Sequence, residues 1–346
     1  MFTVEKEDIS RILRDFGISS DVAAFSELQR YHYEKNDPAS KDVRLIIRAD
    51  LAGGRSVVVR FKHEPDVTLA LVNAQCRFAG FLADNGIKTP ALFLADRAYA
   101  RWYTIRGYDV IVTVEAFAAG ELREVSDEIA QKTGGLLARM HNIAQAGACH
   151  VPGGVLFDPL RENDLFSFAA FRRHEAFLRS VDGALYRGIA EEYHALLQRI
   201  RVFENEPKYA VQGDISNCNL YQTADGEIGV FDFNRCGDAV LYYDAVMQAV
   251  FEARLMDYPK EIAGKQERLI LSAFFRGYHR ERPFTDAQRE ALPYLYAMIS
   301  AFWRGRIQFD EDSLCHAAAA GASVPGGIEG AKTAVLQALR DSGVKL

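Results

Sequence analysis

The apolar residues in the first third of the chain follow two different periods. Ile9, Ile12 and Phe16 recur at helical spacing, which predicts a short amphipathic helix that ends near Gly17. Runs rich in β-branched residues follow and predict strands near 28–33, at 43–49 and 56–61 as a hairpin, and at 91–95 and 109–117. A second helical pattern, over 68–85, lies among them, so this region should form a small sheet crossed by a helix.

Beyond Gly120 the pattern changes to long helices. The first of them has Ser126 as its expected N-cap. Helices are predicted over 126–144, 164–181, 185–203, 239–253, 260–279, 286–302 and 328–341, with one β-hairpin over 219–233. We therefore expect an α+β protein with two lobes: a small antiparallel-sheet lobe over 1–117 and a larger, mostly helical lobe over 118–346.

Composition and charge narrow the range of partners. Of the 346 residues, 49% are hydrophobic and 25% are charged, as in ordinary globular proteins. The net charge is −6, and Lys and Arg are scattered among acids. Binding to the phosphate backbone needs clustered basic residues, so no nucleic-acid partner is expected.

The apolar runs and the cysteines indicate the cellular compartment. No run approaches the ~20 apolar residues that span a bilayer, and the N-terminus lacks the apolar core of a secretory signal. The five cysteines are widely spaced and form no CxxC pair, which argues against a disulfide framework or a zinc ribbon. We expect a cytoplasmic protein that does not enter a membrane; its oligomeric state is left open.

The segment 209–238 carries the clearest chemistry. Asp225–Gly226 is typical of a two-residue type I′ turn. Folding the chain about that turn places Asn219 directly across from Asp232, with side chains on the same face. A carboxylate and an amide oxygen side by side suit a hard cation such as Mg²⁺ that also binds phosphate oxygens. The pattern therefore predicts a metal site at Asn219 and Asp232.

Asp214 lies five residues before Asn219, in the loop that leads into that strand. Asp and Asn are common near hairpins, and each of these residues alone has little specificity. Their order is more informative, because Asp232 follows an apolar strand and stands between Phe231 and Phe233. An acid buried there without a partner would be costly.

This order resembles that of the aminoglycoside phosphotransferase, choline kinase and homoserine kinase (type II) superfamily, which has a protein kinase-like fold. The family loop usually reads H-G-D-x-x-x-x-N, and here Gln212, Gly213, Asp214 and Asn219 occupy those positions. The resemblance implies ATP and Mg²⁺ as cofactors. It implies that Asp214 positions the acceptor hydroxyl and takes its proton, and that Asn219 and Asp232 hold the metal.

Other parts of the chain match the family more weakly. Arg60 lies where the family places a phosphate-contacting cation, and Lys62 shares its strand face, so either could serve, with Arg60 preferred. The backbone of Glu115, Ala116 and Phe117 corresponds to the hinge that binds adenine. His141 and Asp244 also match family positions, and we interpret both as structural.

The sequence departs from the family in three places. Gln212 replaces the usual His, and Gln75 stands where the family typically has a helix Glu that pairs with the strand cation. No G-x-G-x-x-G precedes the sheet. A neutral amide at Gln75 would hold Arg60 or Lys62 less firmly, whereas the proton acceptor and both metal ligands are retained.

The leading hypothesis is an ATP-dependent phosphotransferase that moves the γ-phosphate to a hydroxyl of a small-molecule acceptor. The alternatives are a Ser/Thr protein kinase-like member of the same superfamily and a weakly active nucleotide-binding regulator. The acceptor stays open between a cationic and a carboxylate-bearing ligand. Its expected pocket lies in the helical lobe, with Asp238, Tyr242, Glu252, Tyr278, Trp303 and Arg304 as candidate lining residues.

Overall fold

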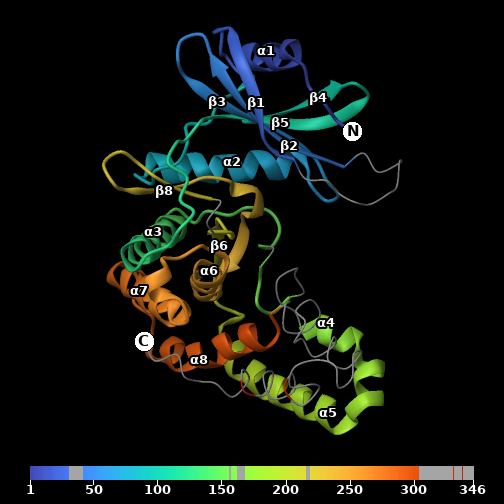
Figure 1. The fold of residues 1–346 in the computed structure, drawn as a ribbon, viewed down its shortest axis with the longest axis vertical. Coiled ribbons are helices and arrows are strands. Elements are labelled where there is room, and N and C mark those ends of the chain that lie inside the picture. Colours follow the sequence, from blue (N-terminus) through green and yellow to red (C-terminus); the bar gives the residue numbers. More distant parts are fainter. Residues whose placement is uncertain are drawn as a thin grey trace. The chain divides into compact units, whose positions relative to one another are not determined.

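The computed structural model describes residues 1–30, 42–155, 157–161, 168–215 and 219–303, together with Gly330 and Gln337. The chain divides into two compact units (Figure 1). Unit 1 comprises Met1–Leu122 and Cys218–Asn234, and unit 2 comprises Arg123–Asn217 and Arg235–Leu346. The segment around Asp232 therefore belongs to the same compact unit as the N-terminal sheet.

Unit 1 is built on a five-stranded antiparallel sheet with the strand order β1-β2-β3-β5-β4. The strands are β1 (Val22–Arg30), β2 (Val43–Leu51), β3 (Ser56–His63), β4 (Ala100–Ile105) and β5 (Tyr108–Ala116). In the central strand, Arg60 pairs with Ile46 of β2 and with Thr113 of β5. Strand β3 thus has a neighbour on both sides, which fixes the direction of its side chains.

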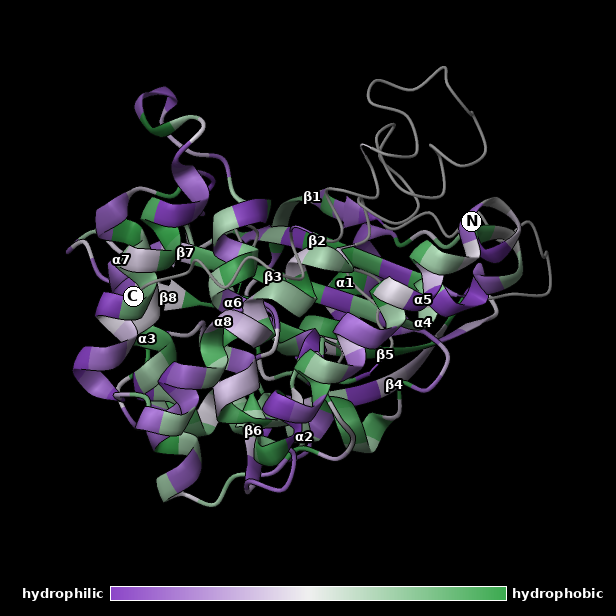
Figure 2. Ribbon diagram, turned by 90° about the horizontal axis from the view of Figure 1, so that it is seen from below, coloured by the Kyte–Doolittle hydropathy of each residue, from purple (hydrophilic) through white to green (hydrophobic). Residues whose placement is uncertain are grey.

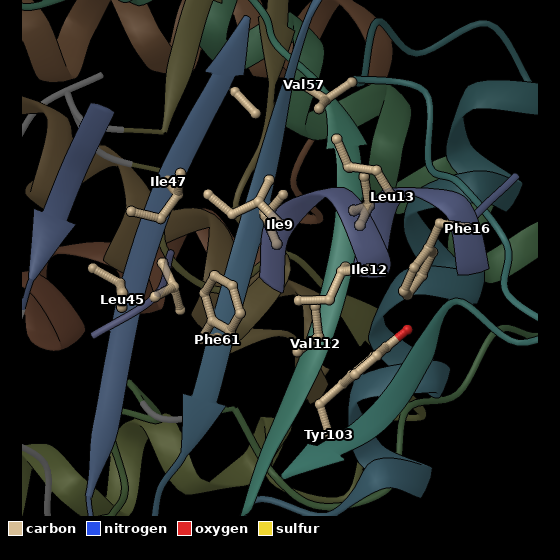
Figure 3. Packing of buried hydrophobic residues seen from close by; sticks show 14 of the residues in the cluster. Ile9, Ile12, Leu13, Phe16, Leu45, Ile47, Val57, Phe61, Tyr103 and Val112 are labelled. Carbon is tan, nitrogen blue, oxygen red and sulfur yellow. The ribbon is translucent and has the colours of Figure 1, made fainter. Parts of the chain in front are cut away.

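Helix α1 (Lys6–Asp15) covers one face of this sheet, as Figure 3 shows. Ile9, Ile12 and Leu13 of the helix pack with Phe61 and other strand residues in a single apolar cluster. Full burial of side chains of this kind stabilises the fold by roughly 1.5–3 kcal/mol each. Because successive strand residues point to opposite faces, Arg60 and Lys62 point away from this cluster.

Most predicted elements of unit 1 are confirmed. They are the first helix, the β2–β3 hairpin, the helix over 68–85 and the strand over 109–117. Helix α2 (Leu69–Asp84) begins at Thr68, whose hydroxyl accepts a hydrogen bond from the Leu71 N–H at 3.1 Å. The first strand begins earlier than predicted, and the last residues of the predicted strand, 31–33, lie outside the described residues.

The predicted strand over 91–95 is wrong. This stretch forms isolated bridges from Leu92 to Glu115 and from Ala95 to Ala98. The chain then turns through Asp96 and Arg97, which have φ of 49° and 66°. Left-handed residues of this kind do not continue a ladder. The edge strand β4 that follows was missed, because its pattern of buried and exposed positions does not alternate regularly.

Unit 2 is mainly helical, and two short strands pair within it. Its helices are α3 (Asp127–Ala146), α4 (Phe168–Arg173), α5 (Glu175–Ile200), α6 (Leu241–Leu255), α7 (Gln266–Glu281) and α8 (Asp286–Ala301). Strand β6 (Lys208–Val211) pairs with β9 (Gly237–Val240). Figure 2 shows both hydrophilic and hydrophobic segments on these helices, as expected when a helix buries one face.

Helices α3 and α7 approach each other closely at their backbones. A Cβ added at Gly134 would lie 1.9 Å from the Phe274 carbonyl oxygen, and one added at Gly277 would lie 1.8 Å from that of Gln131. Only glycine fits at these two positions. This close contact holds α3 in place. His141, a residue of α3, is buried in the interior of unit 2.

The helices of unit 2 follow the prediction except at α4 and α5. The predicted helix over 164–181 breaks between α4 and α5, and α5 continues into the predicted helix over 185–203 through a kink at Asp182 (φ −154°, ψ 95°). Strands β6 and β9 were not predicted. The predicted helix over 328–341 falls almost entirely outside the described residues. Within the described part of the chain, the helices are too short or too polar to cross a membrane.

Candidate active site

Arg60 is the centre of a buried charge cluster in unit 1. Its Nε and Nη2 donate to Oε1 of Glu115 at 3.0 and 2.8 Å, and its Nη1 donates to Oδ2 of Asp232 at 3.0 Å. The three side chains are only 12–13% exposed. One guanidinium therefore binds one carboxylate on strand β5 and one beyond strand β8 (Ile228–Val230).

The charges in this cluster support one another. Burial alone would lower the pKa of Arg60, but the carboxylates of Asp232 and Glu115 raise it above its ordinary value. Burial would likewise raise the pKa of Asp232, but the Arg60 guanidinium and its basic neighbours hold it below its ordinary value. Both groups are therefore charged at neutral pH.

Lys62 lies on the same face of β3 and is more sensitive to its surroundings. Burial lowers the pKa of its ammonium to about 8, although the nearby carboxylates of Glu64 and Asp232 oppose the shift. Its Nζ donates to the side-chain oxygen of Asn234. The prediction that Arg60 and Lys62 share a face is confirmed, and they contact different residues of one short segment.

Asp232 has an unusual backbone conformation for a non-glycine residue. Its φ is 58°, in the left-handed region that Asp adopts more readily than most residues. Its Oδ1 accepts from the Asn234 N–H at 3.2 Å, and the Asn234 carbonyl accepts from Nε2 of Gln75 at 3.1 Å. These bonds hold the segment after β8 in place, with the Asp232 carboxylate toward β3.

The predicted register of the preceding hairpin is wrong by one residue. Strand β7 (Leu220–Gln222) pairs with β8 so that Leu220 opposes Val230, and the Phe231 N–H donates to the Asn219 carbonyl at 3.0 Å. The cause is the turn. The Thr223 N–H bonds to the Glu227 carbonyl at 2.9 Å, so three residues form the loop, and of these Gly226 has positive φ (80°). Asn219 is therefore opposite Phe231, next to Asp232.

A pocket lies within unit 1 at this cluster. Its polar lining includes Arg60, Glu115 and Asp232, and its apolar lining comes from α2 and the segments around it. The residues that line it are Arg60, Val72, Gln75, Cys76, Ala79, Thr89, Pro90, Leu92, Thr113, Glu115, Phe231, Asp232, Phe233 and Asn234. The pocket therefore joins an apolar wall to a charged one, as ligand sites often do.

The predicted adenine-binding stretch is partly engaged in the sheet. The Ala116 N–H donates to the Ala91 carbonyl at 2.8 Å, and the Phe117 N–H donates to the Ser56 carbonyl at 3.0 Å. A base contact from these two residues would have to use their carbonyl groups. Glu115 contributes its side chain to the Arg60 cluster, a role that its position in the sequence did not indicate.

Asp214 lies in unit 2, in the loop after β6. Gly213 precedes it with φ 80°, and a Cβ there would lie 2.5 Å from Cγ2 of Val155 and 2.8 Å from the Arg235 carbonyl oxygen. The Asp214 N–H donates to Oε1 of Gln212 at 2.7 Å. Gln212 therefore shapes this loop through its side-chain oxygen, and Asp214 itself stays partly exposed.

A buried chain of hydrogen bonds leads to the same loop. The Ile215 N–H donates to Oε1 of Gln248 at 2.7 Å, and Nε2 of Gln248 donates to Oδ1 of Asp244 at 3.1 Å. Oδ2 of Asp244 is 2.9 Å from Nε2 of His141, whose Nδ1 is 2.9 Å from the Tyr278 hydroxyl. Burial lowers the pKa of His141, so its ring is neutral and donates from Nε2 to Asp244.

Gln248 was missed by the sequence analysis, although a signal was present. Asp244, Gln248 and Glu252 recur every fourth residue in an otherwise apolar helix. Such spacing places three polar side chains on one buried face, where each needs a partner. His141 and Asp244 are confirmed as interior residues with hydrogen-bonded partners.

The structure gives less support to the residues suggested for the acceptor pocket. Tyr242 and Tyr278 are fully enclosed in unit 2 and bond to the Gln288 carbonyl and to His141. Asp238 accepts from the Val151 N–H at 2.8 Å. Arg304 lies outside the described residues. The two tyrosines are therefore core residues.

Three solved structures of similar fold are kinases or phosphotransferases. The microcompartment-associated aminopropanol kinase has a TM-score of 0.58 at 14% identity, covering 98% of this chain and 99% of that one. An amicoumacin kinase has a TM-score of 0.55 at 14% identity, covering 98% and 93%. An aminoglycoside phosphotransferase from Alicyclobacillus acidocaldarius has 0.51 at 12% identity, covering 92% and 90%. At such identities the likeness shows the fold, which is the protein kinase-like fold predicted above.

Sequence comparisons add the family. A protein of Deinococcus radiodurans is 28% identical over 96 residues, so this match spans about a quarter of each protein, 28% of this chain and 27% of the relative. The model of the phosphotransferase enzyme family matches residues 42–284, which include the β3 cations, Asp214, Asn219 and Asp232. That range is well over half of the chain, and the protein belongs to the phosphotransferase enzyme family.

Proposed function

We propose that this protein is an ATP-dependent kinase that transfers the γ-phosphate to a hydroxyl of a small molecule. The observation that carries the proposal is the buried cluster of Arg60 with Asp232 in the pocket of unit 1. A cation for phosphate and an acid for metal, held within one pocket wall, match the needs of phosphoryl transfer. We place nucleotide binding in residues 1–117 and the catalytic loop and acceptor site in residues 118–346.

The donor set near Asp232 fits a magnesium ion. Asp232 offers a charged carboxylate, and the Asn219 backbone bonds to the neighbouring Phe231 N–H, so we propose the buried Asn219 amide as the second protein ligand. Mg²⁺ prefers few protein oxygens and takes its other ligands from phosphate and water.

Asp214 is the proposed proton acceptor. Phosphoryl transfer asks the protein mainly to align the reactants and neutralise charge, so the acid must be held in one position. Its own N–H is bound by Gln212, and the next N–H, of Ile215, is bound by Gln248. The Gln212 that replaces the family histidine therefore still orders this loop.

Arg60 is the proposed phosphate contact, ahead of Lys62. Arg60 is charged at every physiological pH, whereas burial brings the pKa of Lys62 to about 8. Lys62 also bonds to Asn234 and so supports the segment that carries Asp232. The carbonyls of Glu115, Ala116 and Phe117 are the proposed adenine contacts.

The solved structures of similar fold support a small-molecule acceptor. One is an amicoumacin kinase in complex with AMP-PNP and Ca²⁺, and another is an aminopropanol kinase. We keep Mg²⁺ as the physiological ion and the cytoplasm as the compartment. The acceptor class is left to experiment, since the Arg60 cluster and the Asp214 loop bear on the phosphate and not on the acceptor.

The test combines an acceptor screen with a substitution. ADP release from Mg-ATP should be measured with amino alcohols, amino acids, sugars and aminoglycosides, and then repeated with Asp214→Asn on the best acceptor. We expect Asp214→Asn to lower kcat by at least about a hundredfold and to leave the affinity for Mg-AMP-PNP within about threefold. Near-normal turnover in this variant would refute Asp214 as the base. Tight Mg-AMP-PNP binding without turnover on any acceptor would favour a nucleotide-binding regulator.

A further inference from the structure

The carboxylate that anchors the strand cation comes from an unexpected element. A helix residue at the position of Gln75 would ordinarily supply it, but the Gln75 amide donates to the Asn234 carbonyl at 3.1 Å. Arg60 instead receives its carboxylate from Glu115, which lies two positions along β5 from Thr113, the residue paired with Arg60. The anchor of the cation is therefore part of the same sheet as the cation.

The two edges of the Arg60 guanidinium are used differently. Nε and Nη2 both bind Oε1 of Glu115, at 3.0 and 2.8 Å. Nη1 binds Asp232, at 3.0 Å. A guanidinium has a rigid, planar fork of donors, so fixing one edge also sets the direction of the other. Glu115 therefore aims Nη1 at the place where Asp232 lies.

We propose that Glu115 is the positioning residue of the phosphate-binding cation, in place of the missing helix glutamate. This inference rests on the proposed function, because it assigns Glu115 to hold Arg60 for the nucleotide phosphates. The Glu115 side chain acts through Arg60, whereas the backbone carbonyl of the same residue stays a proposed adenine contact. The position of Arg60 then depends on β3 and β5, which are paired over six residues, and not on α2.

The arrangement also accounts for arginine at this position. A lysine ammonium is a single point charge, so it cannot present one set of donors to Glu115 and another to Asp232. Glu115 would then compete with Asp232 and with phosphate for the same ammonium. A sheet carboxylate on one side and a phosphate on the other require the forked cation, which is the residue found at position 60.

The experiment compares two ligands in the full chain. Affinities for Mg-AMP-PNP and for adenosine are measured by calorimetry in the wild type and in Glu115→Gln. Losing a charge-assisted pair of hydrogen bonds should weaken Mg-AMP-PNP by roughly 10- to 100-fold. Adenosine has no phosphates, so its affinity should change by less than about threefold. Glu115→Gln leaves the backbone carbonyl in place, so an equal loss for both ligands would mean that the side chain serves adenosine binding, and it would overturn the proposal.

Two further variants separate positioning from a merely structural role. Gln75→Glu in the Glu115→Gln background returns a carboxylate to the wall of the same pocket, and it should recover at least about tenfold of the lost Mg-AMP-PNP affinity. Asp50→Asn removes the carboxylate of the Arg48–Asp50 pair on β2 and serves as the control. A control loss equal to that of Glu115→Gln would overturn the proposal.

The proposed function fails separately from this inference. Wild-type protein that does not bind Mg-AMP-PNP overturns both. If the wild type binds Mg-AMP-PNP and a folded Glu115→Gln variant binds it with the same affinity, the inference alone is overturned. Folding of each variant is checked by its thermal unfolding midpoint. If Glu115→Gln does not fold, Gln75→Glu/Glu115→Gln must fold and bind Mg-AMP-PNP, and failure to do so overturns the inference.

Discussion

The two units each contain a polar network, and the networks are built on opposite principles. The network in unit 1 joins charged groups around Arg60, and those groups line a pocket. The network in unit 2 joins His141, Asp244 and Gln248, which are 0–4% exposed, and it ends on the backbone N–H of Ile215. The second network contains no cation, since burial keeps His141 neutral.

The two networks therefore differ in how they can respond to a ligand. Charges that line a pocket can exchange partners with a ligand, because the ligand restores the interactions they give up. A buried chain whose donors and acceptors are all paired cannot exchange, and it fixes the backbone at its end. We therefore expect substitutions in the Arg60 network to change ligand affinity more than stability, and substitutions in the network of His141, Asp244 and Gln248 to change stability first.

The largest effect is expected at Asp244. Asp244→Ala leaves the Nε2 donors of His141 and Gln248 without their acceptor in the interior of unit 2. Stranding two buried donors should lower the free energy of unfolding by about 3–5 kcal/mol. Denaturant titration measures it, with Asp127→Ala, which removes an exposed pair with Arg276, as the control. The control should lose less than about 1 kcal/mol. Equal losses would contradict the assigned role of the buried network.

The next effect concerns Glu252, the third polar residue of that helix face. Its carboxyl oxygens are buried, and their polar neighbour is the Thr133 hydroxyl. That hydroxyl donates to the Ile129 carbonyl at 2.9 Å, so it compensates the buried carboxyl only weakly. Burial raises the pKa of Glu252 from 4.5 to about 8. The folded protein therefore keeps this proton at neutral pH, whereas the unfolded chain loses it above pH 4.5.

This shift predicts a pH-dependent stability. The raised pKa makes the folded state bind more protons than the unfolded state, so the Glu252 contribution falls as pH rises from about 4.5 to about 8. Glu252→Gln keeps the shape and cannot ionise. Its gain in the free energy of unfolding over the wild type should be roughly 2 kcal/mol larger at pH 8 than at pH 6. A gain that is the same at both pH values would show that Glu252 does not titrate in this way.

Asp232 provides the matching test in unit 1. Asp232→Asn removes one carboxylate from Arg60, but Glu115 still pairs with it. The free energy of unfolding should change by only about 1 kcal/mol, whereas Mg²⁺-dependent affinity for AMP-PNP should fall by at least about tenfold. Calorimetry with Mg²⁺ and with EDTA separates the two. A stability loss as large as that of Asp244→Ala would remove the distinction between the networks.

The sequence predicted the parts of this site that depend on local pattern. The β-branched run of β3 placed Arg60 and Lys62 on one face, because strand side chains alternate. The order of Asp214, Asn219 and Asp232 predicted the family, which the match over 42–284 confirms. Each of these inferences needed only the spacing of residues within one segment.

The parts that were missed depend on pairs far apart in sequence. Glu115 is 55 residues from Arg60, and Gln248 is 33 residues from Ile215. A carboxylate in a strand or an amide in a helix gives no sign of which distant partner it will meet. The polar spacing of Asp244, Gln248 and Glu252 did signal buried partners, but not their identity. The hairpin register failed for a local reason, because Asp-Gly fits both two-residue and three-residue turns.

The smallest predicted effect concerns that turn. In the three-residue loop Gly226 needs positive φ, while Asp225 is not among the residues with positive φ. Gly226→Ala should therefore cost about 1 kcal/mol, because alanine is strained at φ 80°. Asp225→Gly should give no gain in the observed turn, since it adds freedom to the unfolded chain and removes the carboxylate that accepts from the Thr223 hydroxyl. A two-residue type I′ turn would require positive φ at both positions, and Asp225→Gly would then stabilise the hairpin. The sign of the Asp225→Gly change in denaturant titration thus decides between the two turns, and with it whether Asn219 faces Phe231 or Asp232.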